Sequence, residues 1–275
     1  MVTLRRTVRL WINPDEAAGP PADQPSYNGF AGRPSPFGLG RFFEIDAACR
    51  GEPDTSTGYL INIKDIDRAV RQAAVPILGN AARSAPDADP TGLLAPMLAA
   101  VAASLPVECI ALTLRTSPYH AFEMAFDAPT IALVRTAFDL AAAHRLNCKS
   151  LSPEQNRDVF GKCNNPAGHG HNYRVEPCVA IDLSKAAPES RSSPFGIAAL
   201  EAITDRVIIE RFDHKHLNLD TPEFNDDTGV NPSVENIARV FFDLLAPAIA
   251  EASPTATLRS VTVWETDRTS ATYPA

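Results

Sequence analysis

The sequence predicts an α+β fold in which one order of elements, ββααββ, occurs twice along the chain. Strand-like and helix-like segments succeed one another in this order in each half. In addition, residues 111–116 in the first half correspond to residues 261–266 in the second, and each of these segments follows an alanine-rich helix by a few residues. Together these patterns indicate an internal duplication of one module.

In the first half, partly alternating apolar and polar residues predict the strands. They are expected at residues 7–12, 41–49, 59–63, 107–116 and 121–126. The second and third of these would form a hairpin, because residues 51–58 have turn chemistry. Asp65 is expected to cap the first helix, and the second helix is expected over residues 93–104. Residues 13–40 are rich in Pro, Gly, Ala and Asp and predict a long irregular loop.

The second half predicts the same plan. Strands are expected at residues 130–146, 170–183, 258–265 and 271–273. One helix is expected over residues 198–212, and another begins after Ser233 and runs to Ala250, with an acid in its first turn. Pro177 would limit strand pairing nearby to an edge or a bulge, because proline has no N–H group to donate.

Composition limits the classes of function. The chain has 275 residues and a net charge of −8, and its basic residues do not cluster, which argues against nucleic acid as a partner. No apolar run approaches the length of a membrane span, and no secretory signal follows the first residues. The five cysteines are irregularly spaced, as is typical of reduced thiols. We therefore expect a cytoplasmic protein that binds neither nucleic acid nor membranes.

A histidine-rich stretch predicts a metal centre. His169 and His171 are two residues apart, so in a strand both imidazoles point to the same face, and Gly170 leaves the opposite face bare. His144 is the nearest candidate for a third ligand. Three neutral imidazoles with an open fourth position are typical of a catalytic zinc site.

Four segments carry a more specific signal. They are Phe160-Gly161-Lys162-Cys163-Asn164-Asn165-Pro166 running into His169-Gly170-His171-Asn172-Tyr173, residues 140–146, Phe212-Asp213-His214-Lys215-His216-Leu217-Asn218, and Val263-Trp264-Glu265-Thr266-Asp267. In this order they resemble the motifs of the 6-pyruvoyltetrahydropterin synthase family, from about residue 128 to the C-terminus. Leu140 replaces the family's phenylalanine, and His216 replaces its usual asparagine.

The resemblance implies a role for each site residue. The implied zinc ligands are His144, His169 and His171. The implied catalytic residues, which move protons, are Cys163, Asp213 and His214. The implied pterin-binding residues are Glu265, Ser233 and Glu235. Two of these roles also have a physical basis: zinc and imidazoles lower the pKa of a nearby thiol, and a carboxylate in an apolar strand requires a partner such as the N–H donors of a pterin.

The implied reaction converts 7,8-dihydroneopterin triphosphate to 6-pyruvoyltetrahydropterin with elimination of triphosphate, a lyase step of tetrahydrobiopterin biosynthesis. The related 6-carboxytetrahydropterin synthase of the queuosine pathway uses the same substrate and is the first alternative. A closed zinc site made from Cys148, Cys163 and two histidines is another, although it would have no free position for substrate. A non-enzymatic zinc- or pterin-binding scaffold is a third, and the intact catalytic set argues against it.

The resemblance also implies the tunnelling fold, in which each module is a four-stranded antiparallel sheet with two helices on one face. Residues 1–127 would form a degenerate module without metal or catalytic residues, since Arg115 stands where Glu265 stands in the second module, residues 128–275. Six modules make up the family's usual assembly, which predicts a homo-oligomer, a trimer of two-module chains, with a dimer as the alternative. Residues 177–196 depart from the family's pattern, which bears on access of the triphosphate.

Overall fold

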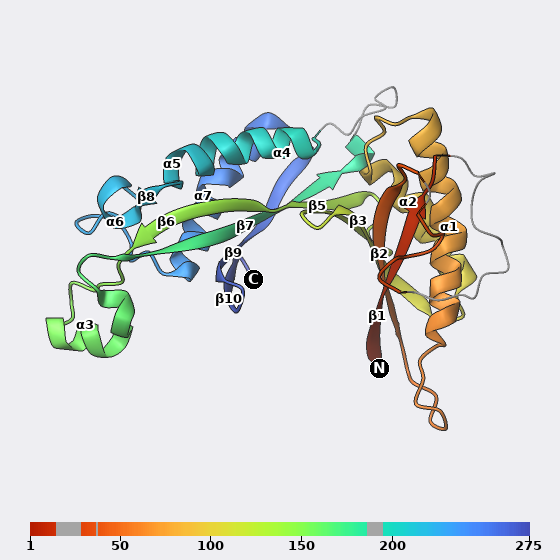
Figure 1. Ribbon diagram of the computed structural model, residues 1–275, viewed down its shortest axis with the longest axis horizontal. Coiled ribbons are helices and arrows are strands. Elements are labelled where there is room, and N and C mark those ends of the chain that lie inside the picture. Colours follow the sequence, from red (N-terminus) through yellow and green to blue (C-terminus); the bar gives the residue numbers. More distant parts are fainter. Residues whose placement is uncertain (15–28, 37, 186–194) are drawn as a thin grey trace. The chain divides into compact units, whose positions relative to one another are not determined.

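The computed structural model describes residues 1–14, 29–36, 38–185 and 195–275 (Figure 1). The chain forms two compact units, each with its own strands and helices. Unit 1 comprises Met1–Val134 and Ile181–Pro194, and unit 2 comprises Arg135–Ala180 and Phe195–Ala275. None of the described helices combines the length and the hydropathy that a membrane span requires.

Unit 1 contains four antiparallel strands in the spatial order β1-β2-β3-β4. The strands are β1 (Val2–Ile12), β2 (Arg41–Gly51), β3 (Glu108–Ser117) and β4 (His120–Ala125). The register pairs Val8 with Ile45 and Ile45 with Leu114. All three side chains are buried, because the period of two directs them to one face of the sheet.

Two helices pack on these strands. They are α1 (Ile63–Ser84) and α2 (Thr91–Ser104). Helix α1 contacts β1, α2 contacts β3 and β4, and the two helices contact each other (Figure 1). Their buried residues recur at helical spacing and include Ile66, Val70, Leu94, Met97 and Val101.

The strand predicted at residues 59–63 is wrong, because a turn takes its place. The Asp54 carboxylate accepts hydrogen bonds from the main-chain N–H groups of Ser56 and Thr57. Gly58 then adopts a φ of 73°, in the left-handed region that glycine reaches without strain. Strand β2 consequently pairs with β1 and β3, and the predicted hairpin does not form.

The start of α1 also differs from the prediction. Asn62, not Asp65, is the N-cap, and its side chain accepts a hydrogen bond from the N–H of Lys64. Asp65 lies in the first turn, where its charge favours the helix dipole. The loop predicted at residues 13–40 falls largely outside the described residues.

Unit 2 contains strands in the spatial order β10-β9-β7-β6-β8. Its strands are β6 (Phe138–His144), β7 (His169–Asp182), β8 (Lys215–His216), β9 (Ala256–Thr266) and β10 (Thr269–Tyr273). Strands β6 and β7 are antiparallel, as are β9 and β10, whereas the short β8 runs parallel to β6. The segment predicted as one strand at 130–146 is divided into β5 (Ile131–Thr136) and β6.

Helix α7 (Val234–Ala252) packs on β9 and β10. A second helical run consists of α4 (Ile197–Thr204), a π-helical turn (Asp205–Ile209) and α5 (Glu210–Phe212). It contacts α7, and the ring centroids of Phe212 and Phe241 lie 4.9 Å apart between them. Shorter helices connect the strands: α3 (Pro153–Phe160), the 3₁₀ turns η1 (Gly161–Asn164) and η2 (Leu183–Lys185), and α6 (Leu217–Asp220).

The pairing of β6 with β7 sets the positions of the predicted site residues. It extends from His144 opposite His169 to Phe138 opposite Val175. Pro177 lies buried in β7 beyond the last of these pairs, so its missing N–H group does not interrupt the β6–β7 ladder. Part of the segment that departs from the family's pattern, residues 186–194, lies outside the described residues.

Candidate active site

Three imidazoles converge at the ends of β6 and β7. His144 is the last residue of β6 and stands directly opposite His169, the first residue of β7. His171 is two residues further along β7 and therefore projects from the same face as His169. One potential ligand atom from each of the three lies within 4.8 Å of the others. The structure thus brings together the three predicted ligands.

The geometry of this cluster fits a metal ion. The Nε2 atoms of His144 and His169 are 3.2 Å apart, and Nε2 of His171 is buried without a hydrogen-bond partner in the described part of the chain. Ligand nitrogens at about 2.0–2.1 Å from a tetrahedral zinc ion are roughly 3.3 Å from each other. Unpartnered, buried imidazole nitrogens are costly unless they coordinate a metal or bind a ligand.

Contacts behind the cluster hold His144 in one orientation. Its Nδ1 lies 2.7 Å from the carbonyl oxygen of Pro232 and 3.4 Å from the hydroxyl of Tyr173. Burial lowers the pKa of His144 to about 4, the largest effect, and the nearby imidazoles act in the same direction. His144 is therefore neutral at pH 7, the state in which an imidazole can donate its lone pair to a metal.

Glu265 on β9 faces the same space. Its Oε1 atom lies 3.5 Å from Nε2 of His144 and 3.6 Å from Nε2 of His171. The carboxylate is only 21% exposed. A partly buried carboxylate beside neutral imidazoles needs either a cation or N–H donors from a ligand to offset its desolvation.

Cys163 lies in η1, a turn that is hydrogen-bonded to the segment following His144. The Cys163 carbonyl accepts a hydrogen bond from the N–H of Leu146 (2.9 Å), and the amide of Asn164 donates to the carbonyl of Leu146 (2.7 Å). Cys163 therefore lies in a turn that is hydrogen-bonded to the chain two residues after His144. The pKa of Tyr173 is raised, by burial first and then by electrostatic interaction with Glu265 and Cys163.

The cysteines do not complete a closed metal site. Among the described residues, the three imidazoles are the only group of metal-binding side chains close enough to share one ion. The thiol of Cys148 instead lies 3.1 Å from the hydroxyl of Ser150. The geometry therefore favours an open, three-histidine site over the alternative with four protein ligands.

Asp213 and His214 form a pair at the end of α5. Asp213 Oδ2 lies 2.7 Å from Nδ1 of His214, and Oδ1 accepts a hydrogen bond from the N–H of Ala141 on β6. Burial opposes ionisation of Asp213, but the hydrogen bonds from Ala141 and His214 outweigh it and lower its pKa. His214 adopts a φ of 56°, rare for a residue with a Cβ, and its side chain is 83% exposed.

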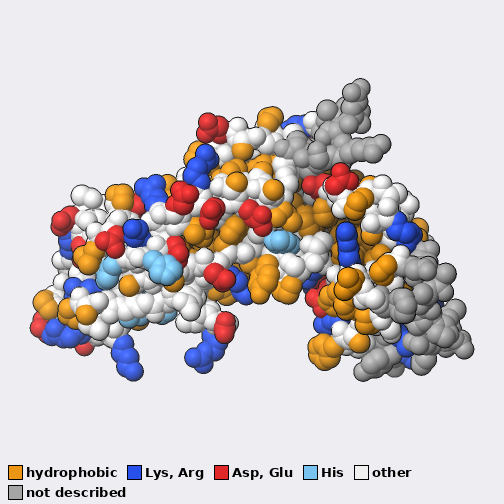
Figure 2. Space-filling view, turned by 45° about the horizontal axis from the view of Figure 1, so that its top comes forward, with side chains coloured by type: hydrophobic (Ala, Val, Ile, Leu, Met, Phe, Trp, Pro, Cys, Tyr) orange, Lys and Arg blue, Asp and Glu red, His pale blue; other side chains and the backbone are white. Residues whose placement is uncertain are grey.

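A groove of about 500 Å³ extends from His214 to the histidine cluster. His171, His214 and His216 line it, together with the main chain of β6. On the face seen in Figure 2, imidazoles reach the surface at the end of unit 2 that carries β8 and α6. His216 packs so closely on Gly168 that a Cβ there would lie 2.5 Å from its Nε2 atom. The groove therefore joins one predicted metal ligand to one predicted proton-transfer group.

Ser233 and Glu235 lie at the start of α7. The Ser233 hydroxyl accepts a hydrogen bond from the N–H of Asn236 (3.4 Å) and is the N-cap of the helix. Glu235 is exposed in the first turn. Neither residue has a described contact with the histidines, but Pro232, which precedes them, holds His144.

Two supporting groups were missed by reasoning from the sequence. Tyr173 is almost fully buried against His144, and its position two residues after His171, on the same strand face, is a signal that the sequence did contain. The carbonyl of Pro232 carries no sequence signal at all, because every residue has a carbonyl group.

Comparison with known proteins identifies the family to which the chain belongs. A family model described as 6-pyruvoyl tetrahydropterin synthase matches residues 133–275, just over half of the chain. The chain belongs to this family. The matched region contains all the predicted metal, catalytic and pterin-binding residues.

Individual members of the 6-pyruvoyl tetrahydropterin synthase family are similar to about the same half of the chain as the family model. The human 6-pyruvoyl tetrahydrobiopterin synthase is 37% identical over 142 residues, which cover 52% of this chain and 90% of the human protein. The Poecilia reticulata protein of that name is 35% identical over 146 residues, 53% of this chain and 92% of that protein. A solved structure of the Caenorhabditis elegans 6-pyruvoyl tetrahydropterin synthase is 31% identical, with a TM-score of 0.45 over 52% of this chain and 94% of that chain. The protein is accordingly an enzyme of the lyase class.

Proposed function

We propose that the protein converts 7,8-dihydroneopterin triphosphate to 6-pyruvoyltetrahydropterin, with elimination of triphosphate, in a reaction that depends on zinc. The observation that carries the proposal is the convergence of three imidazoles with Glu265 in a member of this family. His214, which pairs with Asp213, lines the same groove as His171.

His144, His169 and His171 would hold the zinc ion and leave its fourth position for substrate. When bound, zinc acts as a Lewis acid that makes hydroxyl and neighbouring C–H groups of the substrate more acidic. The contact of His144 with Pro232 supports this assignment, because it fixes the ring so that Nε2 points into the cluster.

Cys163 would remove a proton from the substrate as general base, and Asp213 with His214 would transfer protons on the side of the groove. The hydrogen bonds that join the turn containing Cys163 to the chain next to His144 support the first role. The short Asp213–His214 contact and the exposed imidazole support the second, because a substrate can reach the free ring nitrogen.

Glu265 would anchor the pterin by accepting hydrogen bonds from its N–H donors. Its partial burial supports this role, since a carboxylate in such a position gains most from a ligand that donates to both oxygens. We further propose Ser233 and Glu235 as pterin contacts at the start of α7, where the Glu235 side chain is exposed and available.

Unit 1 would be a second copy of the module that has lost this chemistry. Both units have the element order of two strands, helices and two strands, and the four strands follow the same spatial order, β1-β2-β3-β4 in one and β6-β7-β9-β10 in the other. At the position that corresponds to Glu265, Arg115 forms an ion pair with Asp46 (3.2 Å) instead of facing imidazoles. We propose a cytoplasmic homo-oligomer, a trimer of such chains, with a dimer as the alternative.

Product analysis tests the proposed reaction directly. The metal-loaded protein should convert 7,8-dihydroneopterin triphosphate to 6-pyruvoyltetrahydropterin and inorganic triphosphate, identified by mass spectrometry. Formation of 6-carboxytetrahydropterin would assign the related activity. Absence of any product from protein that carries its metal would contradict both reactions.

A further inference from the structure

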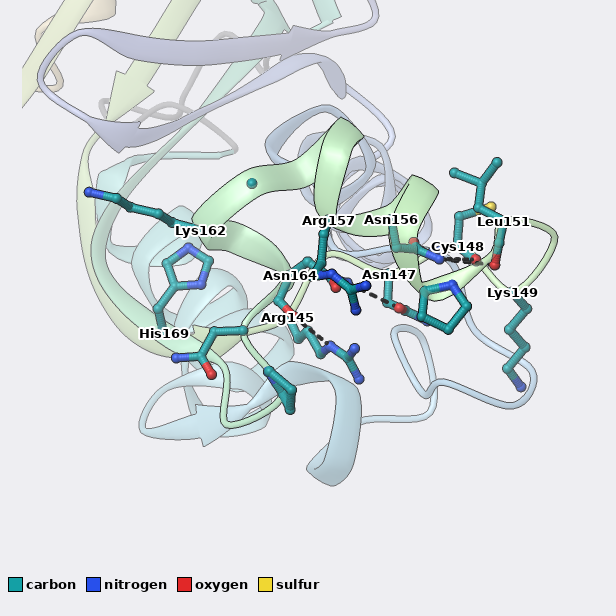
Figure 3. Close-up of a pocket in the computed structure, with 14 residues that line it drawn as sticks. Arg145, Asn147, Cys148, Lys149, Leu151, Asn156, Arg157, Lys162, Asn164 and His169 are labelled. Atoms are coloured by element: carbon teal, nitrogen blue, oxygen red, sulfur yellow. Dashed lines mark hydrogen bonds between the residues drawn. The ribbon is translucent and has the colours of Figure 1, made fainter.

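A basic cavity borders the histidine cluster of unit 2. Its volume is about 930 Å³, and it is enclosed by α3, η1 and the segment that follows β6 (Figure 3). Four cationic side chains line it, and no carboxylate of the described residues does. These are Arg145, Lys149, Arg157 and Lys162. His169 forms part of the wall, so the cavity adjoins the histidine cluster. In a chain with a net charge of −8, this local excess of positive charge points to an anionic ligand.

Arg145 directly follows His144 of the histidine cluster, and hydrogen bonds hold it in place. Its main-chain N–H donates to Oδ1 of Asn218 (2.8 Å), and its Nε donates to the carbonyl of Asn164 (3.2 Å). No other residue in the described ranges accepts a hydrogen bond from its terminal nitrogens. The two terminal NH₂ groups of the guanidinium are therefore free to donate, in a fork that matches phosphate oxygens.

The other cations are easily recruited by a ligand. Arg157 pairs with Glu154 (2.9 Å) and Lys149 with Asp227 (3.0 Å), and both pairs are well exposed to solvent. Exposed ion pairs contribute little to stability, so a multiply charged anion can replace the carboxylates. Lys162 has no carboxylate partner among the described residues. In Figure 3, Lys162 and His169 lie at one side of the cavity, Lys149 at the other, and Arg145 and Arg157 between them.

Asparagine side chains fix the walls of the cavity. Asn156 accepts a hydrogen bond from the N–H of Cys148 and donates to three main-chain carbonyls, including those of Cys148 and Leu151. Asn164 donates to Leu146 and Asn147. Because both amides are buried and their N–H groups donate to neighbouring groups in the cavity wall, the cavity keeps its shape without a ligand.

We propose that this cavity binds the triphosphate group of the substrate and that Arg145 and Arg157 are its main contacts. The inference rests on the proposed function, in which the base takes a proton from a side-chain carbon and the C–O bond to the triphosphate breaks. The bonding electrons leave with the triphosphate, so negative charge develops on the departing oxygen. Cations beside the histidine cluster, with Arg145 held in place, would stabilise that charge and orient the leaving group.

Inorganic tripolyphosphate is the probe, and binding to the metal-loaded full chain is measured by titration calorimetry. We expect binding that weakens with salt, inhibition competitive with substrate, and a loss of affinity of about tenfold or more in Arg157→Ala. Arg68→Ala is the matched control, because Arg68 also lies on a helix and pairs with an acid three residues earlier at 2.9 Å. Metal content is measured after each titration, so that removal of the metal by the probe is recognised.

Arg145→Lys provides a second variant that keeps the charge but loses the forked donors. We expect a higher KM for the triphosphate substrate in both variants. If turnover is normal but tripolyphosphate does not bind, or if both variants behave like Arg68→Ala, the triphosphate site is refuted and the proposed reaction stands. If no pterin is converted while tripolyphosphate binds in an Arg157-dependent manner, the anion site stands and the proposed reaction fails.

Discussion

The Nδ1 atom of His144 lies 2.7 Å from the carbonyl oxygen of Pro232, which joins the end of β6 to the turn that enters α7. A carbonyl group only accepts hydrogen bonds, so Nδ1 carries the proton and Nε2 presents its lone pair to the cluster. The strand pairing brings His169 and His171 to the same place. The contact with Pro232 therefore orients His144 so that its Nε2 atom can serve as a metal ligand beside the other two imidazoles.

The first prediction is that the purified protein carries close to one zinc ion per chain. The double variant His169→Ala/His171→Ala should lose the metal, because only one imidazole of the cluster remains. His120→Ala, in β4 of unit 1, is the control and should retain it. Elemental analysis by mass spectrometry measures the stoichiometry. Two equivalents in the unaltered protein, or full retention in the double variant, would contradict this assignment.

The second prediction separates the proton-transfer role of Cys163 from metal binding. Cys163→Ala should keep its zinc and lose turnover by a factor of about 10²–10⁴, as is typical when a general base is removed. Metal content and steady-state kinetics on the same preparation give the answer. Loss of zinc in both Cys163→Ala and Cys148→Ala would instead favour the closed site with cysteine ligands.

The third prediction concerns the thiols. Cys49, Cys109 and Cys178 are buried, whereas Cys148 and Cys163 are half-buried. A hydrogen bond from the Ser150 side chain lowers the pKa of Cys148, which increases its thiolate fraction. Titration of the native protein with a chromogenic disulfide should therefore detect two fast thiols, and Cys163→Ala should reduce this number to one. Rapid reaction of all five thiols would contradict the burial.

Sequence patterns predicted the order of elements well and failed where two patterns overlap. Residues 59–63 alternate like a strand, yet the Asp54 turn and the Asn62 cap determine their structure. Helix α3 was not predicted, because its eight residues are too few to show a clear apolar periodicity. Its capping box, Ser152 with Gln155, was the available signal.

The candidate site was predictable where side-chain chemistry is encoded by spacing. His169 and His171 are two residues apart in one strand, so their side chains lie on the same face. The structure brings His144 to that face. The sequence could not predict how deeply each side chain is buried or how closely the side chains approach one another. The burial that lowers the pKa of His144 and the approach of Glu265 to the imidazoles both depend on strand register.

The fourth prediction tests the core of unit 1. Arg6 donates two hydrogen bonds, of 2.8 and 2.9 Å, to the buried carboxylate of Asp67 on α1. Arg6→Met removes both hydrogen bonds from this buried carboxylate and should destabilise the protein by about 3 kcal/mol, measured by denaturant unfolding. Arg50→Met is the matched control, since Arg50 forms a similar two-bond pair with Glu108 in an exposed position, and its unfolding midpoint should not change.

The fifth prediction concerns the role of unit 1 in the assembly. Arg115 pairs with Asp46 and no histidine cluster occurs among the described residues of unit 1, so one pterin should bind per chain. Arg115→Glu should leave that stoichiometry at one, because a carboxylate alone does not rebuild the site. Arg115→Gln controls for the repulsion that a new carboxylate would experience beside Asp46.

If unit 1 is a silent module that is needed for assembly, its removal should expose unpaired strand edges, which promote association with other chains. Deletion of residues 1–127 should therefore change the number of chains in the oligomer or cause aggregation, as measured by native mass spectrometry and light scattering. The full chain should form a trimer, which supplies six modules. A truncated protein that is fully active, with the same number of chains, would show that unit 1 is dispensable for assembly, and a separate binding role for unit 1 would then be the better explanation.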